Sequence, residues 1–255
     1  MHTELSSQIE EIGKHLDKIE PDERHYFLEA GANDGLKQSN SISLEMMNWD
    51  GILVEPSPLA FVKLEKNRGC TYKFQCALGD GKQDKLTGSF TNGSLTGSCD
   101  TELIKKDLRA SPTKKFVEKF SSKIGSYLRF LEKPRLIEVN TKTISEIIEA
   151  TNISNIDIMT LDIEGYESTA LRGISQSHDP RIGAIETRTK NSLEISDFFL
   201  SRNYILIRNL TSFTVENNPE WSRDHQDYLW VKIDDENALR ACNTLIGASS
   251  TDSNP

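Results

Sequence analysis

The chain has 255 residues, 36% of them apolar and 27% charged, which suffices for one large globular domain. A net charge of −9 argues against a polyanion-binding surface, so no nucleic-acid partner is expected. The first twenty residues are dotted with charge and no apolar run could span a bilayer, so we expect no secretion signal, no membrane span and a cytoplasmic location.

Segments with the pattern of buried strands alternate with amphipathic helical segments along most of the chain. The expected helices cover residues 6–19, 41–48, 59–67, 144–150, 164–173 and 192–201. The expected strands cover residues 25–30, 51–55, 71–78, 136–140, 156–162, 182–186, 204–207 and 226–233. This alternation predicts an open three-layer α/β sheet. Because little helix fits between Ile207 and Gln226, the last strand is expected to be antiparallel to its neighbour.

An insertion after the third strand, residues 81–135, interrupts the alternation. Residues 87–98 are rich in Gly, Ser and Thr, which is typical of a hairpin or a mobile loop. Residues 101–135 carry ten Lys or Arg against four acids, so this segment is either a lid that faces an anionic substrate or a solvated helical face. We expect one domain over residues 1–246, which includes an N-terminal helix at 1–20, and a disordered tail at 247–255.

A glycine-containing turn follows the first strand and precedes a helix. It contains Glu29, Gly31, Asn33, Asp34 and Gly35. Such a turn lets the charged group of a ligand approach main-chain N–H groups near the positive end of the helix. The turn is therefore a candidate nucleotide-binding site, although a weak signal when it stands alone.

Glu55 strengthens this interpretation, because it ends the second strand twenty residues after Gly35, where an acid can accept both ribose hydroxyls. Glu29 and Asp34 make the turn negative, which would repel a pyrophosphate but suits the amine and sulfonium of S-adenosylmethionine. The residues therefore favour S-adenosylmethionine over a dinucleotide. Asp80, beyond the third strand, is then placed to accept a hydrogen bond from the adenine amino group.

Four segments in order resemble the FkbM-type S-adenosylmethionine-dependent methyltransferases. They are residues 27–35 with Ser39 and Asn40, residues 51–56, residues 77–79, and residues 156–167 with 171–173. The resemblance implies a seven-stranded, Rossmann-like class I methyltransferase sheet and methyl transfer to a hydroxyl, often on a sugar or natural product. It implies a cofactor site formed by Glu29, Gly31, Asn33, Asp34, Gly35, Ser39, Asn40, Glu55, Pro56, Asp80 and Asp162. Asn33 replaces the middle glycine of many class I enzymes, and the insertion has no pattern that aligns.

Methyl transfer to a hydroxyl needs a base, and Asp162 and Glu164 lie where α/β sheets bind ligands. Either is a candidate catalytic proton acceptor. Glu164 and Glu167 have a second explanation, because acids favour a helix N-terminus electrostatically. Asp162, Glu164 and Glu186 together have the ligand chemistry of a hard divalent cation. No metal is expected, because acids beside a sulfonium need none to explain them.

Two other function classes stay open. A nicotinamide-dependent oxidoreductase would use Tyr228 and Lys232 as a Y-x-x-x-K pair, but the alternating pattern predicts a strand, which separates them by about 13 Å. The other is a non-catalytic nucleotide-binding protein with the same sheet.

The expected partner is a small-molecule or glycan acceptor, and the oligomeric state is not predicted. His225 and Trp221 are candidate substrate contacts. The four cysteines have no metal-ligand spacing, which indicates reduced, packed thiols.

Overall fold

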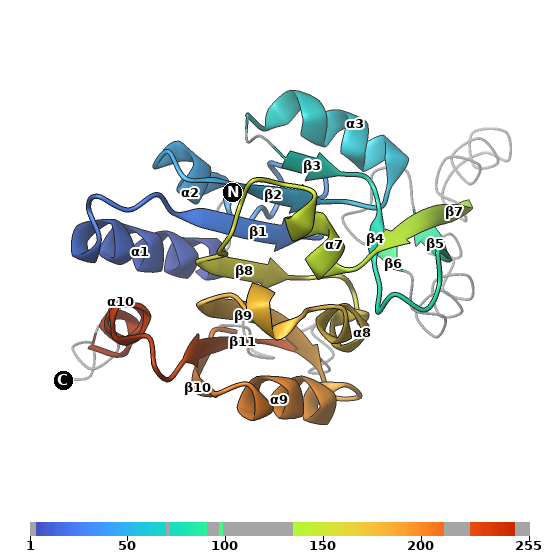
Figure 1. Ribbon diagram of the computed structural model, residues 1–255. Helices are drawn as coiled ribbons and strands as arrows, with labels where there is room; N and C mark the ends of the chain where they lie inside the picture. The colour runs from blue at the N-terminus through green and yellow to red at the C-terminus, as the bar shows by residue number, and fades with distance from the viewer. Residues whose placement is uncertain (1–3, 70–71, 91–96, 99–134, 212–224, 248–255) are drawn as a thin grey trace, which may run out of the picture.

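The computed structural model describes residues 4–69, 72–90, 97–98, 135–211 and 225–247. A seven-stranded sheet of order β10-β11-β9-β8-β1-β2-β3 forms its centre (Figure 1). The strands are β1 (Tyr26–Ala30), β2 (Asp50–Val54), β3 (Tyr72–Phe74), β8 (Ile158–Leu161), β9 (Ile182–Arg188), β10 (Tyr204–Asn209) and β11 (His225–Lys232). All neighbours are parallel except β11, which is antiparallel to β9 and β10. The predicted seven-stranded, Rossmann-like sheet with an antiparallel last strand is confirmed.

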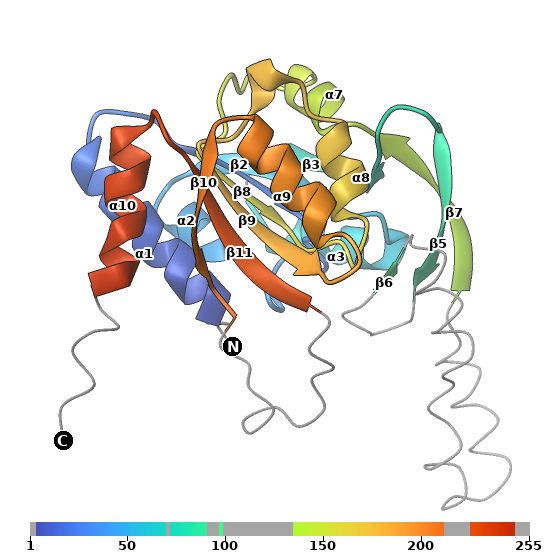
Figure 2. The ribbon, with the colours of Figure 1, turned by 90° about the horizontal axis from the view of Figure 1, so that it is seen from below.

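Helices cover both faces of this sheet and give three layers. One face carries α1 (Glu4–Ile19), α2 (Ile42–Met46), α3 (Pro58–Asn67) and α10 (Glu236–Gly247). The other face carries α7 (Ile144–Glu149), α8 (Glu167–Arg172) and α9 (Ser192–Ser201), and a 3-10 turn, η1 (Gln176–His178), follows α8. In the predicted apolar face of α1, Ile9, Ile12 and Leu16 are fully buried and Ile19 is partly buried. The helix lies beside α10 (Figure 2). The N-terminal helix therefore covers the sheet of its own chain.

A second, smaller sheet has the order β4-β7-β5-β6. Its strands are β4 (Ala77–Leu78), β5 (Lys85–Phe90), β6 (Gly97–Ser98) and β7 (Arg135–Lys142). The prediction of one strand over residues 71–78 is wrong, because the chain leaves the central sheet after Phe74 and then pairs with β7. The expected hairpin is present where Ser89 pairs with Ser98, whereas the basic residues 99–134 and the tail 248–255 lie outside the described residues.

The structure also bears on membrane-spanning helices and on the cysteines. No helix in the described ranges is long and apolar enough to cross a membrane. Cys76 and Cys242 are buried free thiols, as expected for packing cysteines, and burial raises the pKa of each to about 12. Cys70 and Cys99 lie outside the described residues.

Candidate active site

The glycine turn after β1 lies directly against the end of β8. Gly31, Asn33 and Gly35 have φ angles of 85°, 50° and 79°, in the left-handed region that favours glycine and asparagine. A Cβ on Gly31 would lie 1.9 Å from the main-chain oxygen of Asp162. The turn also bonds to β2, because the N–H groups of Gly31 and Ala32 donate to the Val54 carbonyl at 3.0 and 3.1 Å. The predicted cofactor turn and the predicted catalytic acid are therefore neighbours.

Glu29 is the buried centre of a network that shapes the segment after the turn. Its carboxylate accepts hydrogen bonds from the Asn40 main chain at 2.8 Å and from the hydroxyls of Ser39, at 3.0 Å, and Ser41. Arg68, also buried, lies 3.5 Å from the same carboxylate and donates to both serine hydroxyls, at 2.9 and 3.0 Å. Arg68 also lies 2.5 Å from Glu45, so the two carboxylates share this guanidinium, which the sequence did not suggest.

Asp34 likewise bonds to its own turn. Its Oδ1 accepts from the main-chain N–H groups of Leu36, at 3.1 Å, and Lys37, at 2.9 Å. This is the geometry in which a short acid closes a turn. Both acids that were expected to face the cofactor have protein partners, so their role as direct cofactor contacts stays a prediction.

Glu55 directly follows β2, one residue beyond its predicted place at the strand end, and is only 7% exposed. Its carboxylate accepts from the N–H groups of Asn33 and Ser57, both at 2.8 Å. Burial raises the pKa of Glu55 to about 7, although these two hydrogen bonds oppose the shift. A carboxylate has about four acceptor sites, so Glu55 retains capacity for further donors. Pro56 connects it to Ser57, the N-cap residue of α3.

Asp80 follows β4 of the small sheet. Its carboxylate lies 2.7 Å from the Lys82 ammonium and 3.7 Å from Arg172 at the end of α8. The hydrogen bond from Lys82 lowers the pKa of Asp80, so it is ionised at neutral pH. Contact with an adenine ring stays a prediction for this residue.

The segment after β8 is a loop, which corrects the prediction of a helix from residue 164. Glu164 and Gly165 have φ angles of 56° and 96°, and α8 begins only at Glu167. The fully buried Glu167 accepts from the N–H groups of Ile163, at 3.1 Å, and Gly165, at 2.9 Å. The left-handed pair prevents helical geometry here. Glu167 therefore has a structural role, because its carboxylate fixes the loop that carries Asp162 and Glu164.

Three carboxyl groups form a row across adjacent strands, which we call the carboxyl row: Asp162, Glu186 and Asp227. The β8–β9 register pairs Leu161 with Ile185, and Asp162 and Glu186 are the next residues. In the β9–β11 pair, Glu186 lies directly opposite Asp227. Directly opposite residues share a face of a sheet, with Cβ atoms about 5 Å apart. The row begins beside Gly31 and lies at the edge where parallel sheets bind ligands.

The two predicted proton acceptors differ in their surroundings. Glu164 is in an ion pair, with its Oε2 2.5 Å from Nη2 of Arg188, and the same Nη2 lies 3.3 Å from Glu186. Asp162 is exposed, and its carboxylate forms no hydrogen bond or ion pair with the part of the chain that the structure describes. Asp162 is therefore the better placed of the two to meet a substrate hydroxyl.

Acids crowd the row and raise its pKa values. Burial raises the pKa of Asp227 to about 7, helped by the charges of Asp162 and Glu167. Burial also raises the pKa of Glu186 well above its usual range. Desolvation by the surrounding protein and the charge of Glu29 raise the pKa of Asp162, while Arg188 and His225 oppose this. At neutral pH the row therefore retains protons that isolated carboxyls would have lost.

Sequence reasoning missed Asp227, although a signal was present. An antiparallel last strand begins at the edge where its parallel neighbours end, so the first residues of β11 had to lie beside the ends of β8 and β9. His225, a predicted candidate contact, lies opposite Arg188 at the same edge. Trp221 lies outside the described residues.

The oxidoreductase pair is not formed. Tyr228 and Lys232 both lie on β11, as the strand pattern predicted. Lys232 instead lies 2.9 Å from Asp179, and the Tyr228 hydroxyl donates to Gln226 at 2.5 Å. The two side chains therefore have separate partners.

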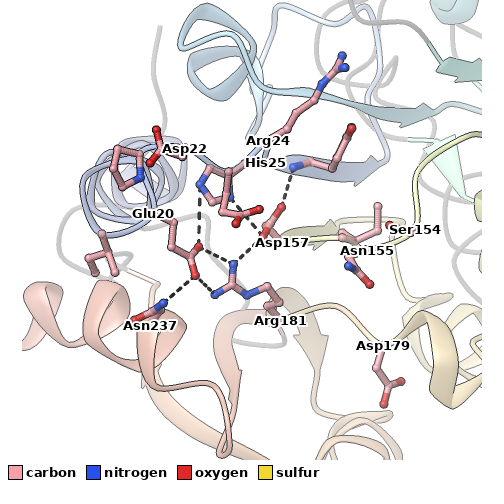
Figure 3. A pocket seen from close by; sticks show the side chains of 15 residues that line it. Glu20, Asp22, Arg24, His25, Ser154, Asn155, Asp157, Asp179, Arg181 and Asn237 are labelled. Carbon is pink, nitrogen blue, oxygen red and sulfur yellow. Dashed lines mark hydrogen bonds and ion pairs between the residues drawn. The ribbon is translucent and has the colours of Figure 1, made fainter.

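A polar pocket of about 780 Å³ lies at the amino ends of β1 and β8, at the opposite end of these strands from the carboxyl row (Figure 3). Glu20, His25 and Asp157 offer ligand atoms within 4.8 Å of one another, the spacing of a metal site. However, Nη1 of Arg181 lies 2.8 Å from both carboxylates, so a guanidinium already holds the place of a cation (Figure 3). Among the described residues, the predicted acids Asp162, Glu164 and Glu186 do not form such a group. The charged groups that line the pocket at the amino ends therefore form a structural network of ion pairs.

The chain is similar to one family of known proteins and to several solved structures. The methyltransferase FkbM domain matches residues 29–206. A precorrin-6y C5,15-methyltransferase from Geobacter metallireducens GS-15 superposes with a TM-score of 0.39 at 11% identity, covering 87% of this chain and 88% of that one. A ribosomal protein L11 methylase from Lactobacillus delbrueckii subsp. bulgaricus gives 0.36 at 6% identity, covering 87% and 77%.

The plantazolicin methyltransferase BpumL, in complex with SAH, gives a TM-score of 0.38 at 8% identity, covering 89% of this chain and 84% of that one. No curated protein matches significantly. The family match spans well over half of the chain and includes the glycine turn, Glu55 and the loop after β8. The chain therefore belongs to the FkbM family of methyltransferases.

Proposed function

We propose that this protein transfers a methyl group from S-adenosylmethionine to a hydroxyl of a small-molecule or glycan acceptor, such as a sugar or another natural product. One observation carries the proposal: the glycine turn lies directly against the end of β8, where the carboxyl row begins. A methyl donor held at the turn would therefore lie next to a carboxyl group that can take the proton from the substrate hydroxyl.

The chain's own residues fit such a donor. Gly31 lets the turn approach the Asp162 main chain closely, because a Cβ there would clash with it, and Glu55 has acceptor capacity for ribose hydroxyls. S-adenosylmethionine supplies an activated methyl group on a positively charged sulfur. Asp162 is the proposed proton acceptor, because Glu164 is held by Arg188.

The first experiment is calorimetric titration of the purified protein with S-adenosylmethionine, S-adenosylhomocysteine and NADPH. We expect binding of the first two and none of NADPH. Incubation of glycosylated metabolites with methyl-labelled cofactor would then identify the acceptor. Binding of NADPH alone would contradict the proposal, and binding without transfer to any acceptor would favour the non-catalytic alternative.

The proposed ribose contact gives a pH-dependent affinity. The Glu55 pKa lies near 7, so at pH 6 only about a tenth of the carboxyls are ionised and able to accept both ribose hydroxyls. The affinity for S-adenosylhomocysteine should therefore rise about tenfold from pH 6 to pH 8. Glu55→Gln should weaken binding and flatten this dependence. An unchanged pH profile in the variant would show that Glu55 does not contact the cofactor.

The same pKa predicts an opposite effect on the stability of the free protein. Between the ordinary pKa of 4.5 and about 7, the folded state keeps a proton on Glu55 that the unfolded state has lost. The contribution of Glu55 to stability therefore falls as pH rises through this interval. Glu55 is thus kept at a site where its charge is unfavourable for folding, which supports a role in binding.

A further inference from the structure

Within the described ranges, more acidic than basic side chains surround the carboxyl row. The nearby carboxyls come from β1 and from the loop and helix after β8, whereas the basic side chains come from β9 and β11. The acids that face the row are Glu29, Glu164 and Glu167, and the bases are Arg188 and His225. Arg188 is shared between Glu164 and Glu186, and Glu29 has Arg68. Among the described residues, the shared Arg188 guanidinium and His225 are therefore the basic groups set against these three carboxyls.

Glu186, in the middle of the row, is the carboxyl group that is best placed to hold a proton. The residue is only 7% exposed. Its Oε1 lies 3.3 Å from Arg188, but its buried Oε2 has no hydrogen-bond partner within the described ranges. A buried, ionised carboxylate oxygen that accepts no hydrogen bond is unfavourable. When the carboxyl is protonated, the same oxygen can donate a hydrogen bond to a neighbouring carboxyl. Asp162 and Asp227 flank Glu186 on either side and offer such acceptors.

We propose that the carboxyl row holds a proton while the site is empty and releases it when a positively charged methyl donor binds at the glycine turn. This inference rests on the proposed function, because it places the donor where Gly31 contacts Asp162. A positive charge beside carboxyls favours their ionised form. Donor binding would thus generate the carboxylate that the reaction requires.

The charge balance of methyl transfer agrees with this role. The acceptor oxygen gains a bond to the methyl carbon, the carbon–sulfur bond breaks, and sulfur keeps the electron pair and becomes neutral. The hydroxyl proton passes to a carboxylate of the row, through Asp162. The site loses one positive charge on sulfur as the row loses one negative charge. The row therefore regains its proton in the same step in which the positive charge on sulfur is lost.

The test measures protons released on binding, and it needs no acceptor. Titrations at pH 7 in buffers of different ionisation enthalpy give the number of protons exchanged for each ligand. The probes are S-adenosylmethionine, S-adenosylhomocysteine, which has a neutral sulfide, and sinefungin, which has an ammonium group in place of the sulfonium. Because Asp227 has a pKa of about 7, we expect the two charged ligands to release about half a proton more than the neutral one. Proton changes at Glu55 are common to all three and cancel in the difference.

Variants assign the released proton to the row. Asp227→Asn and Glu186→Gln keep the shape of the side chains, and each should abolish the difference while S-adenosylhomocysteine still binds. Glu194→Gln is the matched control, because Glu194 is an exposed acid of α9 paired with Arg172 at 2.9 Å, and it should leave the difference unchanged.

Two results would overturn the inference alone. They are equal proton release with charged and neutral ligands, and a difference that persists in both row variants. If none of the three ligands bound, the proposed function itself would fall, so the two failures are distinguishable.

Discussion

Gly31→Ala should reduce the affinity for S-adenosylhomocysteine by about 100-fold or more and lower the free energy of unfolding by about 3 kcal/mol. Its Cβ would lie 1.9 Å from the Asp162 main-chain oxygen, and main chain cannot rotate away as a side chain can. The φ angle of 85° adds about 1–2 kcal/mol of strain for any residue with a Cβ. The ends of β1 and β8 would have to separate, which displaces the turn and the carboxyl row together.

Calorimetry and urea denaturation measure the two effects separately. Gly69→Ala is the control, because its Cβ would meet only the end of the Glu45 side chain, at 3.2 Å, and its φ lies outside the left-handed region. That variant should change stability by no more than about 0.5 kcal/mol. Wild-type affinity in Gly31→Ala would show that the turn can move away from β8 without harm to the site.

The fold was predictable from sequence wherever one local pattern determined one element. The buried strands and the face of α1 have such patterns, because apolar residues repeat at the period of each structure. The helix α10 also has one, since Ala238, Ala241, Cys242 and Leu245 recur at three- and four-residue steps. Three of these four side chains are small, so the apolar pattern of α10 is weaker than that of α1.

The remaining wrong predictions concern segments whose structure depends on contacts with residues that are distant in sequence. Residues 72–78 have the composition of one strand, but β2 pairs with the first part and β7 with the second, more than fifty residues further along the chain. Similarly, Glu164 lies in a sequence compatible with a helix start. Its left-handed conformation is held by Glu167 and by the ion pair with Arg188. Local propensity contains no information about such partners.

The site shows the same division. The positions of Gly31, Glu55 and Asp162 followed from a turn and two strand ends, and the structure brings them to one edge. The partners of Glu29 did not follow, because Arg68 is 39 residues away in sequence and is placed by the end of α3. Asp227 was within reach of reasoning only once the antiparallel direction of β11 was combined with the register opposite Glu186. Electrostatic roles therefore needed the tertiary structure.

Arg181→Met should lower the free energy of unfolding by about 3–5 kcal/mol, because it removes one partner from a partly buried ion network. The guanidinium binds Glu20 at 2.8 and 2.9 Å, Asp157 at 2.8 Å and Asp235 at 2.6 and 3.0 Å. These acids lie at the end of α1, before β8 and before α10, so Arg181 connects both helices to the sheet edge. Methionine keeps an apolar stem but leaves three carboxylates together.

The pH dependence of this variant distinguishes lost charge pairing from lost packing. The pKa values of Glu20, Asp157 and Asp235 are all lowered although burial opposes the shift. Hydrogen bonds from Arg181 are the main cause for Glu20 and Asp235, and for Asp157 they add to hydrogen bonds from His25 and the Tyr26 main chain. In the wild type these acids therefore contribute stability at pH 7 that is lost only as pH falls below their ordinary pKa values. Without the arginine, mutual repulsion and burial should raise these pKa values, and protonation should relieve the variant as pH falls from 7 to 5. Urea denaturation at both values should show a smaller deficit at pH 5. Arg24→Met, whose side chain is 70% exposed and 3.4 Å from Asp50, should change stability by less than about 0.5 kcal/mol at either pH. A deficit independent of pH in Arg181→Met would mean that packing, not charge, holds the two helices at this edge.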